Sequence, residues 1–408
     1  MSVSLFAAAE VALGRQRAPQ HEVGDHVVRY LRSANIADGT LDLGDVKSMN
    51  FTPAEQRTFR LEPGDVLVTE GSGSRDMVGA SAVWHGDLGG TVCFQNTLLR
   101  MRPRRGISDG GYLAWWARHA HAAGLMASVA SGANILHLGA ENLRRLPIEL
   151  PTLDEQRRIA DFLDDQVSRI DSAIARRARS ASLLKERWQA SLSRYCDNPK
   201  DPRVPLKRVA WWREGPGILT EDFREEGTPL LRIANVKGAT FTLDGCNYVD
   251  SMMARWRWNH LAVHAGELLI SGSASAGLAV EVPVEAEGAI PYTGLIRTAP
   301  RSRDLDKEFL RFFLLSRAFG EQVDLMKTGI GLQHWGPYHL SQVAIRLPSV
   351  TEQHARARVL ESEQSIATEL VESQTKAHLL LRERKRALIT AAVTGEFDVS
   401  TASGRNTA

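Results

Sequence analysis

The chain contains one long internal repeat. Residues 137–156 (HLGAENLRRLPIELPTLDEQ) align without a gap with residues 334–353 (HWGPYHLSQVAIRLPSVTEQ), and LLKERWQASL (183–192) matches LLRERKRALI (380–389) at the same offset. The identical pairs of the first stretch include His137/His334, Gly139/Gly336, Leu143/Leu340, Leu150/Leu347, Pro151/Pro348, Glu155/Glu352 and Gln156/Gln353. This period is far longer than the roughly 20–50 residues of solenoid repeats. The sequence therefore predicts a duplicated domain with its own helix, and so two similar binding faces in one molecule.

Each copy continues into a long helix whose start is marked by a capping box. Thr152 with Glu155, and Ser349 with Glu352, have the spacing in which a hydroxyl and a glutamate satisfy free amides at a helix start. We predict helices over residues 151–198 and 348–395, each about 60 Å long because an α-helix rises about 1.5 Å per residue.

Helices of this length need a packing partner. Apolar residues recur about every seven positions in the first helix, the spacing of a coiled-coil seam, and less regularly in the second. The residues predicted for the helix-pair interface are Leu163, Val167, Ile170, Ile174, Leu184, Trp188, Val359, Ile366, Leu370 and Leu380. In this interpretation the two helices pair with each other; the alternative is that each packs on its own domain.

The segments before the helices, residues 1–150 and 203–347, have the pattern of α+β domains. Residues 64–69 and 266–271 are Gly/acid turns that enter short buried strands, and residues 98–100 and 295–297 form a second matched strand pair. The Pro- and Asp-rich stretch 197–204 marks the boundary between the copies. Residues 399–408 are small and polar, and we expect them to form a disordered tail.

Composition limits the class of protein without naming a function. The 408 residues are 43% hydrophobic and 24% charged, which is ordinary for a globular chain with more than one core. A net charge of +2 permits a nucleic-acid partner but does not demand one. The spacing of the three cysteines matches neither a metal site nor a disulfide framework. No apolar run reaches the roughly 18 residues of a membrane span. We expect a soluble protein of the cytoplasm, without a signal peptide.

The sequence lacks catalytic motifs. It has no P-loop, HExxH, GxSxG or Cys/His cluster, so we expect no catalytic residue and no metal site. The matched His137 and His334 are interpreted as structural or DNA-facing. Small polar loops follow the same strand in both copies and offer hydroxyls and amides to phosphate, although ordinary exposed turns have the same composition. The candidate residues in these loops are Ser72, Ser74, Arg75, Ser273 and Ser275.

A polar motif recurs in one strand of each domain. Arg32 and Asn35 match Arg232 and Asn235, residue types that read guanine and adenine but also make structural hydrogen bonds. Two recognition faces should differ at the residues that determine which bases are read. Identity between the copies therefore favours a structural or phosphate-binding role for these four residues. Base readers are expected in the stretches that diverge, which are residues 40–60, 71–95, 237–260 and 273–293, ending at Gln95 and Thr293.

Taken together, these motifs resemble the specificity subunit of type I restriction-modification systems. The resemblance rests on the two LP-x-x-x-EQ helix starts, the RxAN strands and the ending ALITAAVTGEFDV (387–399), and it covers essentially the whole chain. It implies an α+β fold with two tandem target recognition domains, each reading one half of a split sequence in double-stranded DNA. It also implies that the two helices pack as an antiparallel coiled coil that fixes the separation of the half-sites.

The resemblance further implies a division of labour between subunits. Two modification subunits dock on this chain and methylate adenine with S-adenosylmethionine, while restriction subunits use ATP and Mg²⁺ to translocate and cut DNA. The chain itself binds no cofactor and is not an enzyme. Two alternatives stay open, namely an orphan DNA-recognition subunit and a protein-interaction scaffold. One departure concerns Ser2–Arg17, which matches residues 205–211 poorly. Either the first strand is expected to be degenerate, or the start of the first copy is expected to be shortened.

Overall fold

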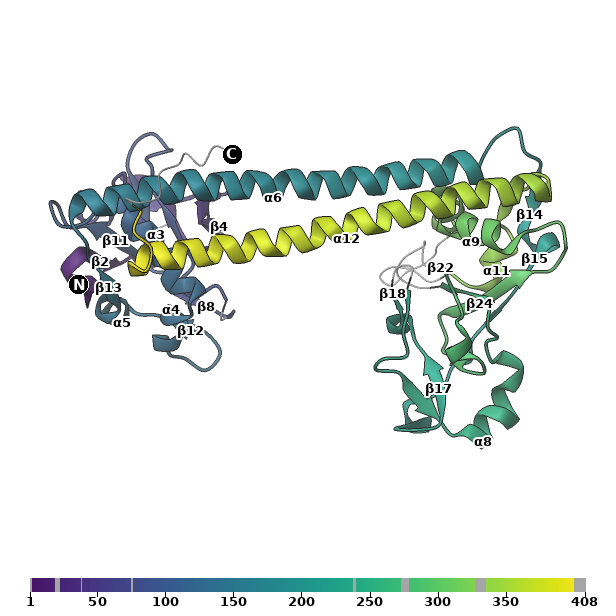
Figure 1. The fold of residues 1–408 in the computed structure, drawn as a ribbon. Coiled ribbons are helices and arrows are strands. Elements are labelled where there is room, and N and C mark those ends of the chain that lie inside the picture. Colours follow the sequence, from purple (N-terminus) through teal and green to yellow (C-terminus); the bar gives the residue numbers. More distant parts are fainter. Residues whose placement is uncertain are drawn as a thin grey trace. The chain divides into compact units, whose positions relative to one another are not determined.

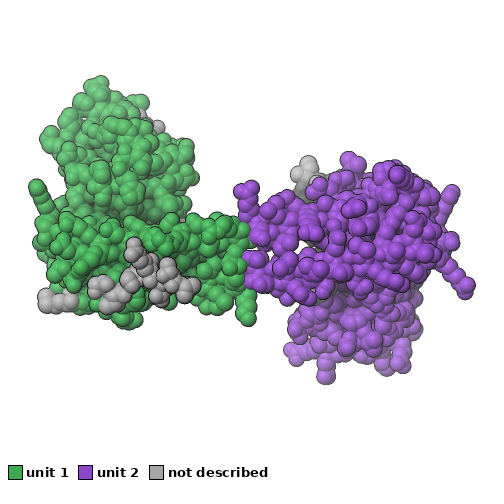
Figure 2. All heavy atoms as spheres, turned by 45° about the horizontal axis from the view of Figure 1, so that its top comes forward, with its two compact units in different colours: residues 1–177, 376–408 green, residues 178–375 purple. Residues whose placement is uncertain are grey.

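The chain forms two compact units. The computed structural model describes residues 2–18, 23–37, 39–74, 76–237, 240–272, 279–326 and 335–399. Unit 1 comprises residues 1–177 and 376–408, and unit 2 comprises residues 178–375 (Figure 2). Two long helices, α6 (Leu153–Cys196) and α12 (Val350–Thr394), each contribute one part to either unit (Figure 1).

Unit 1 is built on two small sheets. The four-stranded antiparallel sheet has the order β2 (Ala9–Leu13), β11 (Leu98–Pro103), β7 (Val66–Thr69) and β9 (Ser81–Val83). The second sheet has the order β10 (Val92–Phe94), β3 (Val27–Leu31) and β6 (Lys47–Asn50), with β10 and β3 parallel. All four residues of β7 are buried. Val66 and Val68 share one core with Trp115 and Trp116 of helix α3 (Gly110–Ala122), and Leu67 belongs to a second core.

Unit 2 repeats this architecture, with one additional strand, β16 (Phe223–Arg224), in its second sheet. Its first sheet has the order β15 (Ala210–Glu214), β24 (Leu295–Pro300), β21 (Leu268–Ser271) and β22 (Ala279–Glu281). The second has the order β16, β20 (Asn247–Val249), β17 (Thr228–Leu231) and β23 (Ile290–Pro291), and β17 is parallel to β23. Helix α9 (Lys307–Leu315) buries Phe309, Phe312 and Phe313 in the place of the α3 tryptophans. The predicted α+β class with two tandem domains is confirmed.

The N-terminal residues form the same elements as their counterparts in unit 2. Strand β1 (Ser2–Ser4), the turn α1 (Leu5–Ala8) and β2 correspond to β14 (Arg203–Pro205), α7 (Leu206–Val209) and β15. β1 pairs with β13 (Pro147–Glu149), as β14 pairs with β25 (Ala344–Arg346). The expectation of a degenerate first strand is therefore wrong. Leu5 and Leu206 are identical and buried, and they lie at an offset of 201, against 197 for His137 and His334.

The two long helices run antiparallel within each unit. In unit 1, Asp171 of α6 accepts two hydrogen bonds from Lys385 of α12 at 2.7 and 2.8 Å, while residues 155–159 lie against residues 392–395. In unit 2, Leu184 and Trp188 line one groove with Ile366 and Leu370, and Arg356 Nη1 donates to the Tyr195 carbonyl at 3.1 Å. The predicted capping boxes are present, with Thr152 Oγ1 and Ser349 Oγ contacting Glu155 and Glu352 at 2.8 and 3.0 Å.

The helix seam differs from the predicted one. Leu163, Val167 and Ile170 are buried, the first two in the core that α6 shares with α3 and with Ile389 of α12. Ile174, Leu184 and Trp188 are half-buried. On α12, the predicted residues are all exposed by 39–56%: Val359, Ile366, Leu370 and Leu380. Ala357 and Leu360 are buried instead, because this part of α12 turns its apolar face toward the module as well as toward α6. The predicted α12 residues therefore do not form a buried seam, although Ile366 and Leu370 line one groove with Leu184 and Trp188 of α6.

The glutamine of each EQ motif is completely buried and fully hydrogen-bonded. Gln156 accepts from the Asp109 amide at 2.9 Å and donates to the carbonyls of Ile107 and Pro151 at 3.0 and 2.9 Å. Gln353 makes the same three contacts with the Asp306 amide and with the Asp304 and Pro348 carbonyls, each at 2.8 Å. Asp109 and Asp306 cap α3 and α9. The motif therefore ties the start of each long helix to the cap of the module helix.

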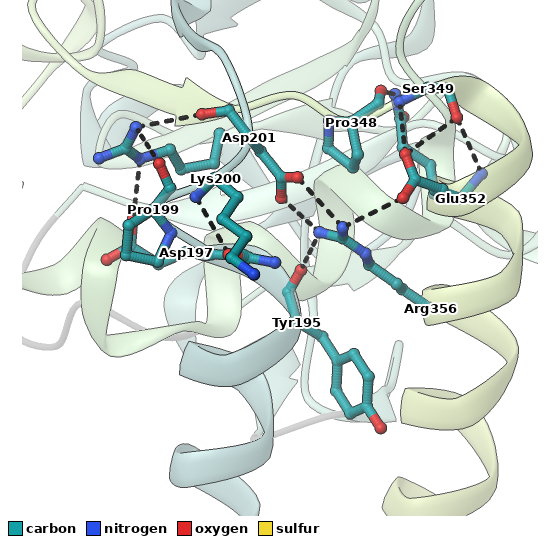
Figure 3. Close-up of polar contacts among 12 residues, drawn as sticks. Tyr195, Asp197, Pro199, Lys200, Asp201, Pro348, Ser349, Glu352 and Arg356 are labelled. Atoms are coloured by element: carbon teal, nitrogen blue, oxygen red, sulfur yellow. Dashed lines mark hydrogen bonds and ion pairs between the residues drawn. The ribbon is translucent and has the colours of Figure 1, made fainter.

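The stretch between the two copies is held in place by α12 (Figure 3). Asp201, 8% exposed, accepts two hydrogen bonds from the Arg356 guanidinium, one of them at 3.1 Å. Arg356 also donates to the Tyr195 carbonyl near the C-terminal end of α6. The hydrogen bond to Asp201 raises the pKa of Arg356 above its usual value. Residues 197–204 thus form a structured connection. We call Arg356 with its partners Asp201 and Tyr195 the Arg356 cluster.

Val399 does not belong to a free tail. It packs, partly buried, against the core of unit 1, and Phe397 packs its ring against Phe162 with 5.7 Å between centroids. The remaining residues of the predicted tail, 400–408, lie outside the described residues. Within the described part of the chain, no helix is both long enough and apolar enough to cross a membrane.

Candidate functional site

The predicted polar loop of unit 1 follows a short two-stranded antiparallel pairing. Strand β8 (Gly71–Ser72) pairs with β12 (Leu136–His137), so that Ser72 lies opposite Leu136. Ser74 donates its amide to Ser72 Oγ at 3.0 Å, and His137 Nδ1 lies 2.9 Å from Glu70 Oε2. The structure thus brings Ser72 and His137 together at one edge. Arg75, Ser273, Ser275 and His334 lie outside the described residues.

The asparagines of the RxAN motif are structural. Asn35 is 2% exposed and accepts from the Arg32 amide at 3.0 Å, while its amide group donates to the Asp42 carbonyl at 2.8 Å. Asn235 is 3% exposed and contacts the Arg232 amide at 2.8 Å and the Thr242 carbonyl at 3.1 Å. Their inclusion among DNA-binding residues is wrong, because their polar atoms are already occupied by the turn that they stabilise.

The arginines of the motif belong to a surface that recurs in both units. In unit 1, β3 and β10 are parallel neighbours, and Arg32 and Gln95 directly follow their C-terminal ends. The Gln95 amide donates to the Leu31 carbonyl at 2.9 Å, which fixes the two ends side by side. Lys47 starts β6 opposite Tyr30 of β3. We call the surface formed by Arg32, Lys47 and Gln95 the unit 1 reading surface.

The unit 1 reading surface lines an open groove of about 660 Å³ with a cationic wall. Arg17, Ser33 and Thr97 complete its polar lining, and the Ser33 amide donates to Thr97 Oγ1 at 3.0 Å. Asp45 contacts both Arg32 and Lys47, at 2.5 and 2.6 Å. The hydrogen bond from Lys47 lowers the pKa of the Asp45 carboxyl, with Arg32 contributing. Because these ion pairs are solvent-exposed, they are weak and leave both cations available to an incoming anion.

Unit 2 presents the same positions with different chemistry. Arg232 and Tyr292 follow the parallel strands β17 and β23, and the Tyr292 amide donates to the Leu231 carbonyl at 2.8 Å. Asn247 opens β20 opposite Leu230, as Lys47 opens β6. Arg232 donates to Asn247 Oδ1 at 3.2 Å and lies 5.9 Å from the centroid of the Tyr292 ring. Arg232, Asn247 and Tyr292 form the unit 2 reading surface.

Thr293 lies beside this surface but is tied to a carboxylate. Its hydroxyl donates to Glu214 Oε1 at 3.3 Å, and the Gly294 amide donates to the same oxygen at 3.0 Å. Unit 2 therefore places a negative charge at the position where Leu13 stands at the end of β2 in unit 1. Each surface carries an amide side chain and has a carboxylate nearby. The unit 1 surface has two cations, Arg32 and Lys47, while the unit 2 surface has one arginine and an aromatic ring.

Sequence reasoning named Arg32, Gln95 and Arg232 but missed Lys47, Asn247 and Tyr292. All three missed residues fall within the divergent stretches in which base readers were expected, or at their margin. The signal that could have found them is the strand pairing, because it shows that Lys47 and Asn247 occupy one register. Side chains of the Arg, Lys, Asn and Gln types match the donor and acceptor patterns of base edges.

Two observations concern metal ligands and thiols among the described residues. These residues contain no group of three or more His, Cys, Asp or Glu side chains that could hold a metal ion. Burial raises the pKa of the Cys93 and Cys196 thiols to about 12, so both are protonated at neutral pH and poor nucleophiles. The arrangement suits binding of a polyanion with hydrogen-bonding edges.

Comparison with known proteins gives a consistent family. Residues 40–178 match the family described as "Type I restriction modification DNA specificity domain". The chain is 22% identical over 343 residues to the Type I restriction enzyme MjaVIII specificity subunit of Methanocaldococcus jannaschii, covering 78% of both chains. It is 23% identical over 393 residues to the Type I restriction enzyme EcoKI specificity subunit of Escherichia coli, covering 91% of this chain and 83% of the relative.

Solved structures share the fold over nearly the full length. A chain from work on the "Structural basis underlying complex assembly and conformational transition of the type I R-M system" has a TM-score of 0.76 and 19% identity, covering 97% of this chain and 98% of that one. The HsdS subunit from Thermoanaerobacter tengcongensis has a TM-score of 0.55 and 19% identity, covering 97% of each chain. At this identity the likeness concerns the fold.

Proposed function

Because the chain belongs to the family of type I restriction-modification specificity subunits, we propose that its two modules each read one half of a bipartite target in double-stranded DNA. Members of this family are non-catalytic components of type I restriction-modification complexes. The observation that carries the proposal is the pair of reading surfaces, which have one backbone architecture and two side-chain sets. Two such surfaces suit two different half-sites.

The chemistry of each surface indicates what it contacts. In unit 1, Gln95 can pair with adenine, and Arg32 and Lys47 can pair with guanine or with phosphate. In unit 2, Asn247 can pair with adenine, Arg232 with guanine, and the Tyr292 ring can contact a thymine methyl group. Glu214 beside Thr293 repels phosphate and accepts from the cytosine amino group. We therefore expect the two half-sites to differ in sequence.

The proposal also covers partners and cofactors. We propose that two modification subunits dock on this chain and carry S-adenosylmethionine, and that restriction subunits supply the ATP- and Mg²⁺-dependent steps. Each unit contains antiparallel segments of α6 and α12, and the two helices start at equivalent EQ motifs, so two copies of one partner could dock on related surfaces. The chain itself contributes DNA sequence choice and binds none of these cofactors.

A methylome tests the proposal directly. Genomic DNA is sequenced for N6-methyladenine in cells with the gene intact and deleted. A split motif that loses methylation on deletion supports the proposal and identifies the target. If no motif changes, an orphan subunit or a protein scaffold becomes the better account. DNA binding measured with the co-purified methyltransferase then separates these two, since only the orphan subunit binds duplex DNA more tightly than a neutral control protein does.

Single substitutions on the reading surfaces should relax one half-site each. Gln95→Ala is expected to reduce discrimination at one position of the first half roughly 10- to 100-fold, the value of one bidentate base contact, and to leave the second half unchanged. Asn247→Ala should do the reverse. The measurement is the methylated motif and its occupancy in cells that express each variant.

Glu141→Gln, an exposed substitution on α5 (Ala140–Arg145), serves as the control and should leave both halves intact. Relaxation of both halves by Gln95→Ala would contradict independent reading by the two modules. An unchanged motif in both variants would remove these two residues from the set of base readers.

A further inference from the structure

An exposed tryptophan in unit 2 stands outside both reading surfaces. Trp256 is 88% exposed and lies in a π-helical turn, η5 (Ala254–Trp258). Met252, in the preceding turn α8 (Ser251–Met253), is 81% exposed. Large apolar side chains clustered on the surface mark interaction sites, and π-helical turns often occur at functional positions.

The exposure of Trp256 is not a sign of a loose segment. Asp250 caps α8 by accepting from the Met253 amide at 2.8 Å. Ala254 and Trp258 on either side of Trp256 are 3% and 5% exposed, and both belong to the core that packs under β20 and β17. The turn is therefore anchored at both ends, and the anchoring holds the Trp256 ring in solvent.

The charges around Trp256 select the kind of partner. Arg255 and Arg257 flank it, both exposed, and neither has a carboxylate partner within the described residues. The Arg257 guanidinium lies 5.6 Å from the centroid of the buried Trp258 ring, which holds it near the turn. A ring between two unpaired cations complements a base step between two phosphates. An apolar protein surface would leave both arginines without counter-charges.

We propose that Trp256 is a wedge against the DNA duplex at the half-site of unit 2, with Arg255 and Arg257 on the phosphates at either side. The inference rests on the proposed function. Asn247 opens β20, and α8 and η5 follow the other end of this strand, so the wedge and the unit 2 reading surface would contact the DNA at two separate points. Apolar wedges unstack base steps and kink the duplex, so unit 2 would add DNA deformability to its direct readout.

The corresponding element of the first copy, all of whose residues are described, lacks this device. Helix α2 (Pro53–Phe59) follows β6 as α8 follows β20, and Thr52 caps it as Asp250 caps α8. None of the large exposed apolar side chains of unit 1 lies on α2. The wedge is therefore specific to unit 2, and the DNA kink is expected on that side of the bipartite target alone.

The test uses the full chain with its methyltransferase partners and a duplex labelled at both ends with a fluorescence-transfer pair. Trp256→Ala should weaken DNA binding roughly 10-fold, the value of one lost aromatic–base contact, and should reduce the change in transfer that reports the kink. Trp256→Phe, which keeps a ring, should retain most of both signals. Val284→Ala, at another exposed apolar residue of unit 2, is the matched control and should change neither.

The arginines are tested by salt dependence. Arg255→Gln and Arg257→Gln should each lower the slope of log affinity against log salt by about 0.9, one released counterion per phosphate contact. Unchanged DNA affinity and kink in Trp256→Ala would overturn the wedge and leave the proposed function intact. Loss of the methyltransferase partner with unchanged DNA binding would reassign Trp256 to a protein interface. Absence of DNA binding by the unaltered complex would overturn the proposed function itself.

Discussion

Arg356→Ala is expected to lower the free energy of unfolding of unit 2 by about 3–5 kcal/mol, the cost of removing one partner from a buried ion pair. The substitution leaves the Asp201 carboxylate, 8% exposed, without its two guanidinium donors. It also removes the donor to the Tyr195 carbonyl in the last turn of α6, a place where a positive charge is favourable to the helix. Hydrogen exchange of residues 192–205 should accelerate, while exchange in unit 1 stays unchanged.

Two controls separate the Arg356 cluster from a general effect of charge removal. Arg169→Ala breaks an exposed pair with Asp165 on α6 and should cost about 0.5 kcal/mol or less. The double variant Arg356→Leu with Asp201→Leu should recover much of the loss, because an apolar pair needs no counter-charge. Wild-type exchange rates in Arg356→Ala would mean that the cluster contributes no net stability.

The tandem-domain organisation could be predicted because the duplication is visible as a repeat in the sequence. Capping boxes, EQ motifs and strand-entering turns are local signals, and each copy repeats them. The role of Gln156 and Gln353 was not readable, because two of the three hydrogen-bond partners of each glutamine lie in the module, well before the motif in the chain. A sequence shows that a glutamine recurs and does not show which carbonyls it meets.

The predictions of the interface residues on α12 and of the residues on the reading surfaces were incomplete for a related reason. A heptad pattern predicts the partner of a helix only when the helix has one partner, and α12 packs on a module as well as on α6. Lys47, Asn247 and Tyr292 are brought beside Arg32 and Arg232 by strand pairing. Divergence between the copies pointed to the correct stretches of sequence, but only the fold selects the residues in them that share a surface.

Gln353→Leu should destabilise unit 2 by about 3 kcal/mol or more. The glutamine is completely buried, and leucine, of similar size, leaves the Asp306 amide and the Asp304 and Pro348 carbonyls without partners. Each buried unsatisfied group costs about 1–3 kcal/mol, which exceeds the gain from one apolar side chain. The measurement is hydrogen exchange at the starts of α9 and α12, together with denaturant unfolding.

The repeat supplies an internal control for this prediction. Gln156→Leu removes the same three hydrogen bonds in unit 1, so it should accelerate exchange at the start of α3 and leave α9 unchanged, while Gln353→Leu does the opposite. Gln342→Leu, at an exposed glutamine of unit 2, should stay within about 0.5 kcal/mol of wild type. Each buried glutamine, with its three hydrogen bonds, is a clamp that ties a module to its long helix. We therefore also expect Gln353→Leu to reduce methylation occupancy without altering the methylated motif. A changed motif would mean that the clamp shapes the reading surface.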